Sequence, residues 1–263
     1  MKRIAIFLLL GIILFGMVQA QVTTFNFKNE DQKDWSFSIT PYALLASQAT
    51  DVGGEKIRQS FNDLASITNA GFQFMSTVRY KRFSLSIDGT FAELSTSEQQ
   101  GPVGLKVTIN QNIIDLAAGY VIYSTFDSKE EDIAKGWAIE GLIGAKNWVN
   151  NIKLDLNIDL GDLGNITETI DEPLGWWDLM IGIKTAIALS DKVMLGAKLS
   201  VGGFGIGDSS SFAHDFYYLN AFKVLNYMTV NAGFRSFRYK RTSDGLNTTV
   251  RVLGPFLGVS FFL

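Results

Sequence analysis

The sequence predicts an all-β fold: a closed antiparallel up-and-down β-barrel of about 10 strands that spans a membrane. Apolar residues alternate with Gly, Ala, Ser or charged residues along much of the C-terminal half, as over 178–189 and 193–202. A soluble sandwich would place surface polar residues on its second face, whereas small residues with occasional charges suit the narrow lumen of a small barrel. The alternating segments are also long and follow an export signal, which favours an outer-membrane barrel.

The N-terminus predicts an export signal. Lys2 and Arg3 form a positive region, an apolar core follows over 4–18, and small residues at 18 and 20 form a cleavage site. An uncleaved membrane anchor is the alternative, although the apolar core is short against the ~20 residues of a spanning helix. Cleavage is expected after Ala20. The chain then divides into three parts: a signal peptide over 1–20, a periplasmic leader over 21–33 and an outer-membrane barrel over 34–263.

Ten segments are predicted as strands, because each alternates apolar with small or polar residues. They are 34–46, 69–80, 82–95, 107–124, 137–148, 175–189, 192–206, 211–224, 226–241 and 248–263. Most exceed the ~9–11 residues that a tilted membrane strand needs. Eight or twelve strands remain open, because 150–160 also alternates and the charged stretch 126–136 is long for a periplasmic turn.

The connections between these strands are predicted to alternate in length, as periplasmic turns and outer loops do in outer-membrane barrels. Short periplasmic turns are expected at 80–82, 189–192 and 224–226. Long outer loops are expected at 47–68, 96–106 and 149–174. A helical turn is expected within 55–67, in the first of these loops.

The composition narrows the classes of function. The chain has no Cys, which excludes disulfides, thiolate metal sites and cysteine nucleophiles. Even with Lys2 and Arg3 counted, the 23 Lys and Arg are fewer than the 26 Asp and Glu, so nucleic-acid binding is disfavoured. The chain has a single His, so a transition-metal site is not expected, and neither is a cofactor.

Charged residues on the small-residue face of the strands are predicted to line the lumen. They are Arg79, Asp88, Asp115, Glu140, Lys146, Asp178, Lys184, Lys198 and Arg235. Because both signs are mixed, a network of ion pairs that stiffens a narrow interior is the main interpretation. A charged constriction that tunes a small pore is the alternative, and a catalytic carboxylate site is the third. About ten strands leave little open lumen, since about eight are already filled by side chains.

Two motifs resemble active-site elements but lack the surrounding residues or elements that such sites require. His214 lies close to Ser209, Ser210 and Ser211, but no nucleophile elbow or other triad pattern accompanies it, so we interpret it as a residue near an outer loop. The glycine run over 202–207 resembles a phosphate-binding loop, yet no helix follows it. No catalytic residue is therefore predicted.

Aromatic residues near the predicted strand ends are expected to form girdles at the two membrane interfaces. The tryptophans of these girdles are Trp35, Trp137, Trp148, Trp176 and Trp177. At the end of the chain, Phe261, Phe262 and Leu263 are predicted to form the signal that the barrel assembly machinery reads. The final residue is Leu, whereas a barrel's last strand usually ends on an aromatic.

Several segments, in this order along the chain, resemble an uncharacterised family of Gram-negative outer-membrane β-barrel proteins of the small OmpA-type and porin-like kind. They are Trp35–Tyr42, Phe61–Leu64, Arg79–Asp88, Ala118–Tyr120, Trp177–Lys184, Val201–Asp208, Asn231–Arg235 and Leu253–Gly258. The resemblance implies a barrel in the outer membrane. It implies no particular activity.

The sequence therefore predicts a non-enzymatic outer-membrane barrel that is structural or forms a narrow pore for a small solute. Outer-membrane lipid and the barrel assembly machinery are the expected partners. A membrane-embedded enzyme that modifies lipid or peptide is one alternative. A surface-binding or adhesion barrel, which would act through its long outer loops, is another. A soluble lipocalin-like barrel is the rival fold.

Overall fold

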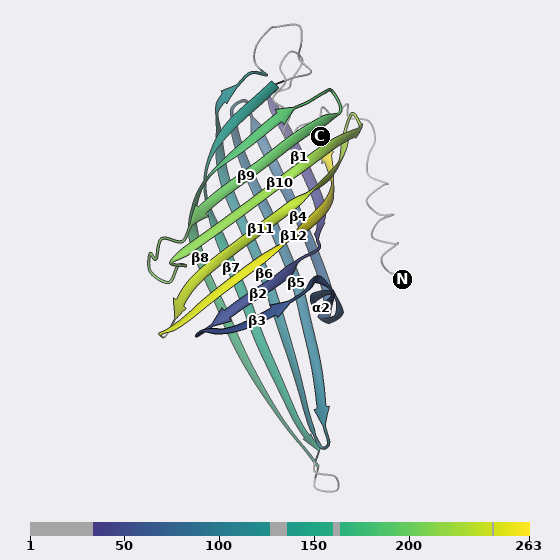
Figure 1. The fold of residues 1–263 in the computed structure, drawn as a ribbon, viewed down its shortest axis with the longest axis vertical. Coiled ribbons are helices and arrows are strands. Elements are labelled where there is room, and N and C mark those ends of the chain that lie inside the picture. The colour runs from purple at the N-terminus through teal and green to yellow at the C-terminus, as the bar shows by residue number, and fades with distance from the viewer. Residues whose placement is uncertain (1–33, 127–135, 160–163, 244) are drawn as a thin grey trace.

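The computed structural model describes residues 34–126, 136–159, 164–243 and 245–263. Ten strands form a closed antiparallel barrel, as predicted (Figure 1). Each barrel strand pairs with the next one along the chain, and β1 closes the ring by pairing with β12. The barrel strands are β1 (Trp35–Leu44), β4 (Thr68–Tyr80), β5 (Phe83–Gln100), β6 (Val103–Ser124), β7 (Gly136–Asp159), β8 (Asn165–Ala188), β9 (Val193–Gly202), β10 (Phe212–Leu225), β11 (Met228–Ser243) and β12 (Leu246–Phe262).

The connections at the two ends of the barrel differ, and we name the ends by them. The predicted short turns after β4, β8 and β10 are confirmed, and they share one end with Trp35 and the C-terminus; we call it the periplasmic end. The opposite end is the outer end. The predicted signal over 1–20, the leader over 21–33 and nearly all of the charged stretch 126–136 lie outside the described residues.

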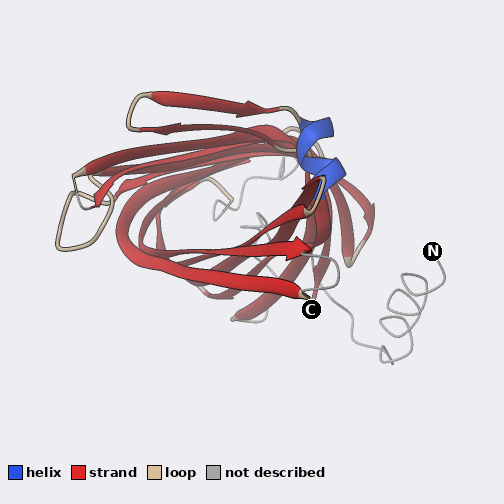
Figure 2. Cartoon of the chain, turned by 90° about the horizontal axis from the view of Figure 1, so that it is seen from below, coloured by secondary structure: helices blue, strands red, loops and turns tan. Residues whose placement is uncertain are grey.

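Two further strands and a helix form the first outer connection. β2 (Ser47–Val52) continues the course of β1 along β12, because both strands pair with β12. β3 (Glu55–Gln59) folds back on β2, and this hairpin leads into the helix (Figure 2). Between β1 and β2 the amide of Leu45 donates to the carbonyl of Pro255 at 2.9 Å. A Cβ at Gly254 would overlap the carbonyl of Leu45, so glycine permits this close approach.

The predicted helical turn is helix α2 (Phe61–Ile67). Ser60 caps it: the Ser60 hydroxyl accepts from the amide of Asp63, and the Asp63 carboxylate accepts from the amide of Ser60 at 2.7 Å. The Ser60 backbone hydrogen bond lowers the pKa of Asp63. Among the described residues, no helix is long and apolar enough to cross a membrane.

Four neighbouring strands, β5 to β8, project past the rest of the barrel at its outer end (Figure 1). Pairing of β5 with β6 continues to Gln100 and Val103, and pairing of β7 with β8 continues to Asp159 and Asn165. The predicted loops over 96–106 and 149–174 are therefore wrong, because most of these residues continue the strands. Of the further alternation noted at 150–160, residues 150–159 belong to the part of β7 that projects beyond the shorter strands, and residue 160 lies outside the described residues.

The outer wall of the barrel is apolar, and its inner face is buried. Along β8, Leu179, Ile181 and Ile183 are about half exposed, whereas the alternate residues Asp178, Met180 and Lys184 are buried. A strand places successive side chains on opposite faces, so one face meets the surroundings and the other fills the lumen. The exposed apolar wall is the surface that lipid covers in a membrane barrel.

Candidate functional site: paired charges in the lumen and an apolar sheet face

The lumen contains charged side chains that are almost completely buried. All nine charges predicted to face inward have buried side chains in the structure. The structure adds Asp215 of β10, which the sequence prediction missed although Ala213 and Tyr217 share its face. The buried charges among the described residues are five cations and five carboxylates: Arg79, Lys146, Lys184, Lys198 and Arg235, with Asp88, Asp115, Glu140, Asp178 and Asp215.

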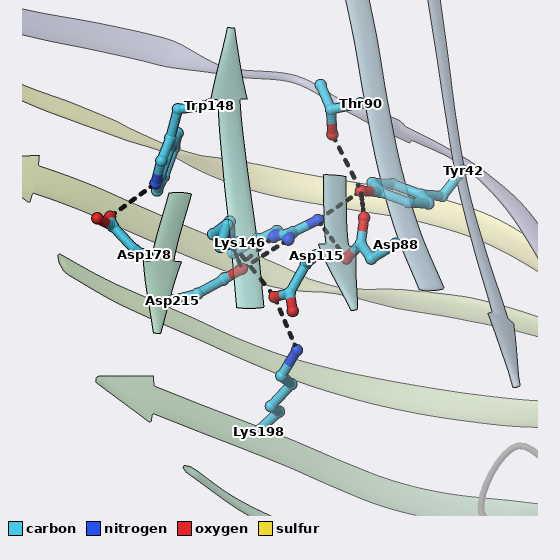
Figure 3. Close-up of polar contacts among 10 residues, drawn as sticks. Tyr42, Asp88, Thr90, Asp115, Lys146, Trp148, Asp178, Lys198 and Asp215 are labelled. Atoms are coloured by element: carbon cyan, nitrogen blue, oxygen red, sulfur yellow. Dashed lines mark hydrogen bonds and ion pairs between the residues drawn. The ribbon is translucent and has the colours of Figure 1, made fainter. Parts of the chain in front are cut away.

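Asp215 lies at the centre of the largest network (Figure 3). Its carboxylate accepts from the ammonium of Lys146 and from two nitrogens of Arg235, with Nη2 to Oδ2 at 2.7 Å and Nε to Oδ1 at 3.2 Å. Asp115 accepts from Lys198 at 3.1 Å and from Lys146 at 3.5 Å. Cations and carboxylates from β6, β7, β9, β10 and β11 are thus paired across the lumen.

Arg235 links this network to β1 and β5. Its Nη1 lies 2.8 Å from Oδ2 of Asp88 and also donates to the hydroxyl of Tyr42. The Tyr42 hydroxyl donates to Oδ1 of Asp88 at 2.9 Å and lies 3.4 Å from Oγ1 of Thr90 (Figure 3). The network therefore connects opposite walls of the barrel.

A second cluster surrounds Glu140. The Glu140 carboxylate lies 2.8 Å from Arg79 Nη2 and 3.7 Å from Lys184 Nζ, and it accepts from the hydroxyl of Ser84. A Cβ at Gly119 would overlap this carboxylate, so the absence of a side chain there makes room for Glu140. The cluster joins β4, β5, β7 and β8.

Asp178 is held by neutral donors. The indole of Trp148 donates to Asp178 at 2.8 Å, and the amide of Ser210 donates to it at 2.7 Å. The indole of Trp176 in turn donates to the hydroxyl of Ser210 at 2.9 Å. These contacts fix the connection between β9 and β10 across the outer end of the lumen.

Trp148 and Trp176 lie inside the barrel, so their predicted place in a membrane-interface girdle is wrong. Their exposed fractions are 1% and 4%, and both rings lie about 5 Å from the ring of Tyr239, at 4.9 and 5.0 Å. Trp148 shares the face of Lys146 on β7, and Trp176 shares the face of Asp178 on β8, because each pair is two residues apart. Together with other apolar residues, they fill the outer part of the lumen.

Trp35, Trp137 and Trp177 are exposed on the wall. Trp35 packs against Tyr80, and Trp137 packs against Tyr123, each pair with ring centroids 4.7 Å apart near the periplasmic end. At the C-terminus, Phe262 is buried, whereas Phe261 and Leu263 are exposed. Recognition of these three residues by the barrel assembly machinery stays a prediction.

His214 lies on the wall of the barrel, not in the lumen. Its neighbours in β10, Ala213 and Asp215, are fully buried, and its ring lies 5.8 Å from that of Phe212. Strand alternation therefore separates His214 from the lumen carboxylates. No group of three or more His, Asp or Glu among the described residues is placed to hold a metal ion.

Beyond the barrel, the projecting parts of β5 to β8 form an amphipathic sheet. The face that continues the lumen side carries aliphatic residues in cross-strand register. We call it the extension face: Leu94, Val103, Leu105, Val107, Ile109, Ile152, Leu154, Leu156, Ile158, Ile166, Ile170 and Leu174. Six of these residues, Val103, Leu105, Ile152, Ile166, Ile170 and Leu174, have exposed fractions between 39% and 54%.

The opposite face of the extension is polar. Lys106, Lys153 and Asp155 lie on it, with Lys153 and Asp155 3.4 Å apart. The hydroxyl of Thr169 donates to Asp155 at 2.7 Å and lowers the pKa of that carboxyl. The polar face of this sheet can form hydrogen bonds with water, whereas its aliphatic face is exposed and uncovered.

No protein-family model matches the chain, and no curated protein matches it. Among solved structures, the outer membrane protease OmpT from Escherichia coli is similar at a TM-score of 0.50 and 9% identity, over 88% of this chain and 97% of that one. The attachment invasion locus protein Ail of Yersinia pestis is similar at a TM-score of 0.35 and 10% identity, over 87% of this chain and 98% of that one. Neisserial surface protein A gives 0.33 and 12%, over 87% and 97%.

At these identities the likeness concerns the fold alone. The predicted resemblance to Gram-negative outer-membrane barrels is confirmed at that level, and the chain is a barrel of the outer-membrane type.

Proposed function

We propose that this protein is a non-enzymatic outer-membrane barrel with a closed lumen, and that it binds a protein partner at its outer end through the extension face. The observation that carries the proposal is the uncovered aliphatic face of β5 to β8. Soluble surfaces rarely expose a contiguous apolar patch of this kind unless it is an interaction site. Of the functions predicted from the sequence, this proposal favours the surface-binding barrel over the narrow pore for a small solute.

The lumen charges support a closed interior. The five buried cations and five buried carboxylates balance, whereas a constriction that selects ions usually carries rings of one sign. Lys146, Asp215 and Arg235 bridge the centre of the barrel, and the cluster around Trp148 lies on their outer side. These contacts leave the charges engaged with each other instead of with a passing solute.

The placement of His214 supports a role without catalysis. A hydrolase of the Ser/His or Asp/His kind needs its base within hydrogen-bond reach of the nucleophile. His214 faces away from the lumen, while the lumen carboxylates Asp115, Glu140 and Asp215 are each engaged with cations. These interior carboxylates therefore form ion pairs that stabilise the barrel.

The size of the extension face suits one amphipathic element of a partner. From Val103 to Ile109 the face is roughly 20 Å long at ~3.4 Å per residue, and across four strands it is roughly 14 Å wide. A helix with side chains is about 10–12 Å in diameter. One helix of a partner would therefore cover most of the aliphatic residues.

The charges on the extension face favour a basic partner. Glu98, Leu105, Leu156 and Glu168 form one row across the four strands, so a carboxylate stands at each edge of the aliphatic surface. A second copy of this chain would bring glutamates toward glutamates. The favoured partner is a polypeptide segment with an apolar stripe flanked by Lys or Arg.

The test uses the full barrel in detergent and two synthetic amphipathic helices of equal length. Both carry a Leu stripe, flanked by Lys in one peptide and by Glu in the other. We expect the Lys peptide to bind at least tenfold more tightly in a fluorescence anisotropy titration. Glu98→Lys together with Glu168→Lys should reverse this preference.

The matched controls are adjacent residues on opposite faces. Leu105→Asn should weaken binding of the Lys peptide, whereas Lys106→Asn, on the polar face, should leave it unchanged. Equal binding of both peptides, or equal effects of the two Asn variants, would reject the proposal. A barrel that dimerises in analytical ultracentrifugation and becomes monomeric with Leu105→Asn would also reject it, in favour of a second copy as the occupant.

A further inference from the structure

Basic side chains are concentrated on the outer ends of β11 and β12 and on the β2–β3 hairpin. In one row of cross-strand partners, His214, Arg238, Arg251, Ala49 and Arg58 follow one another. The adjacent row on the outer side contains Lys240, Thr249, Asp51 and Lys56. We call the five cations of these rows the basic rim: Lys56, Arg58, Arg238, Lys240 and Arg251.

The basic rim lies on the wall of the barrel. Phe237 and Tyr239 of β11, and Val250 and Val252 of β12, are buried in the lumen. Because successive strand residues alternate between faces, Arg238, Lys240 and Arg251 point the other way. This face is the one that meets the membrane.

The rim begins where the apolar belt ends. On β12, every outward residue from Leu253 to Leu263 is apolar, Pro255 included, and Arg251 comes next toward the outer end. On β11, the outward residues from Met228 to Phe234 are apolar, and Ser236 and Arg238 follow. The run on β12 matches the ~9–11 residues with which a tilted strand crosses the hydrocarbon, so the rim lies at the level of the lipid headgroups.

The rim cations have no ion-pair partner among the described residues. Asp51, the carboxylate within the rows, accepts from the amide of Gly54 at 3.0 Å instead. The Nε of Arg238 is buried and has no hydrogen-bond partner. The rim is thus a cluster of unpaired cations at one depth, although the formal net charge of the chain is −3. An anion from outside the chain would supply the missing partner.

We propose that the basic rim binds the phosphate groups of an anionic lipid in the leaflet at the outer end of the barrel. Guanidinium groups suit phosphate because they present parallel N–H donors, and Lys adds charge. Anionic headgroups attract basic residues that lie within a Debye length of the membrane surface. The site is separate from the extension face, so it does not depend on the proposed partner.

The test measures lipid binding by the full barrel refolded in phosphatidylcholine vesicles that contain a fluorescent phosphatidic acid. Energy transfer from the barrel tryptophans should show that phosphatidic acid is enriched about tenfold over labelled phosphatidylcholine. The enrichment should fall as NaCl is raised, because it rests on surface charge. Equal enrichment of the two lipids, or an enrichment that salt leaves unchanged, would overturn the proposal.

The variant pair Arg238→Gln and Arg251→Gln should abolish most of the enrichment. Its matched control is Lys106→Gln with Lys153→Gln, which removes the same charge from the extension and should have no effect. An equal loss from both pairs would show that net charge, and not the rim, attracts the lipid. Displacement of the lipid by inorganic phosphate at equal phosphate concentration would likewise overturn the assignment to a lipid. If this Gln pair fails to fold, Lys56→Gln with Arg58→Gln on the β2–β3 hairpin is the second variant, and an enrichment that it leaves unchanged would overturn the proposal.

Discussion

Asp215 is the residue through which most of the lumen network passes. It contacts Lys146 and Arg235, and these cations contact Asp115 and Asp88 in turn. Removal of one member of a buried ion-pair network leaves the remaining charge without a partner in a region that excludes water. The consequence for stability is therefore larger than the loss of a surface pair.

We predict that Asp215→Asn lowers the free energy of unfolding by about 3 kcal/mol, at the low end of the usual cost because each cation keeps a second carboxylate. Urea unfolding of the barrel refolded in vesicles measures this change. Asp191→Asn makes the same chemical substitution at the exposed turn after β8 and should change the free energy of unfolding by less than about 0.5 kcal/mol. Similar values for the two variants would contradict a stabilising network.

At the scale of elements, strand length separates two parts of the molecule. β1, β9 and β10 have the length of a membrane crossing, with 10, 10 and 14 residues, whereas β7 and β8 have 24 each. The additional residues carry the extension face outside the membrane. The first connection differs again, because it contains β2, β3 and the capped helix α2.

The capping box of α2 gives this element a pH dependence. The hydrogen bond from Ser60 lowers the pKa of Asp63 in the folded state. The stabilisation is therefore fully present above the ordinary Asp pKa of about 3.9 and is lost as the pH falls through the lowered value. We predict that the amide resonances of 61–64, followed by NMR in detergent, are constant from pH 7 to about 5 and shift at lower pH.

The matched variant for this prediction is Asp63→Asn. Asparagine keeps an acceptor at the cap but does not titrate, so the same resonances should not change with pH. A shift of equal size in the variant would assign the titration to another group.

For the whole molecule, the proposed closed lumen rests on the balanced buried charges and on the aromatic cluster around Trp148. We predict that the refolded barrel gives no discrete conductance steps in a planar bilayer, while its gel migration remains heat-modifiable. A general porin inserted under the same conditions supplies the positive control. Reproducible steps from the native barrel would contradict the closed lumen and favour the narrow pore, with Arg79, Asp88, Asp178 and Lys198 as the residues to substitute.

Much of the fold followed from local alternation. The ten strands were predictable because apolar and small residues alternate for longer than a globular strand needs. The inward placement of Lys146 and Asp178 followed from the same rule. The predicted girdle positions of Trp148 and Trp176 rest on their place near a strand end, whereas alternation puts them on the inward face of Lys146 and Asp178.

Other features were harder to predict from the sequence. Asp215 was missed because aromatic residues occupy both faces of β10, with Phe216 outside and Tyr217 inside, so the alternation there is weak. The sequence predicts a loop over 149–174, where β7 and β8 continue, because the outward face of this segment is polar. Such a face is equally compatible with a strand that has left the membrane.

By itself, the sequence determined which residues form strands and, for most side chains, whether they lie on the inner or the outer face. Both depend on neighbours along the chain. Only the tertiary structure decided which charges meet. Lys146 of β7 reaches Asp215 of β10, 69 residues away, because closure of the barrel brings their strands around one lumen. Alternation fixes the face of a side chain, whereas the stagger between strands fixes its height and its partners.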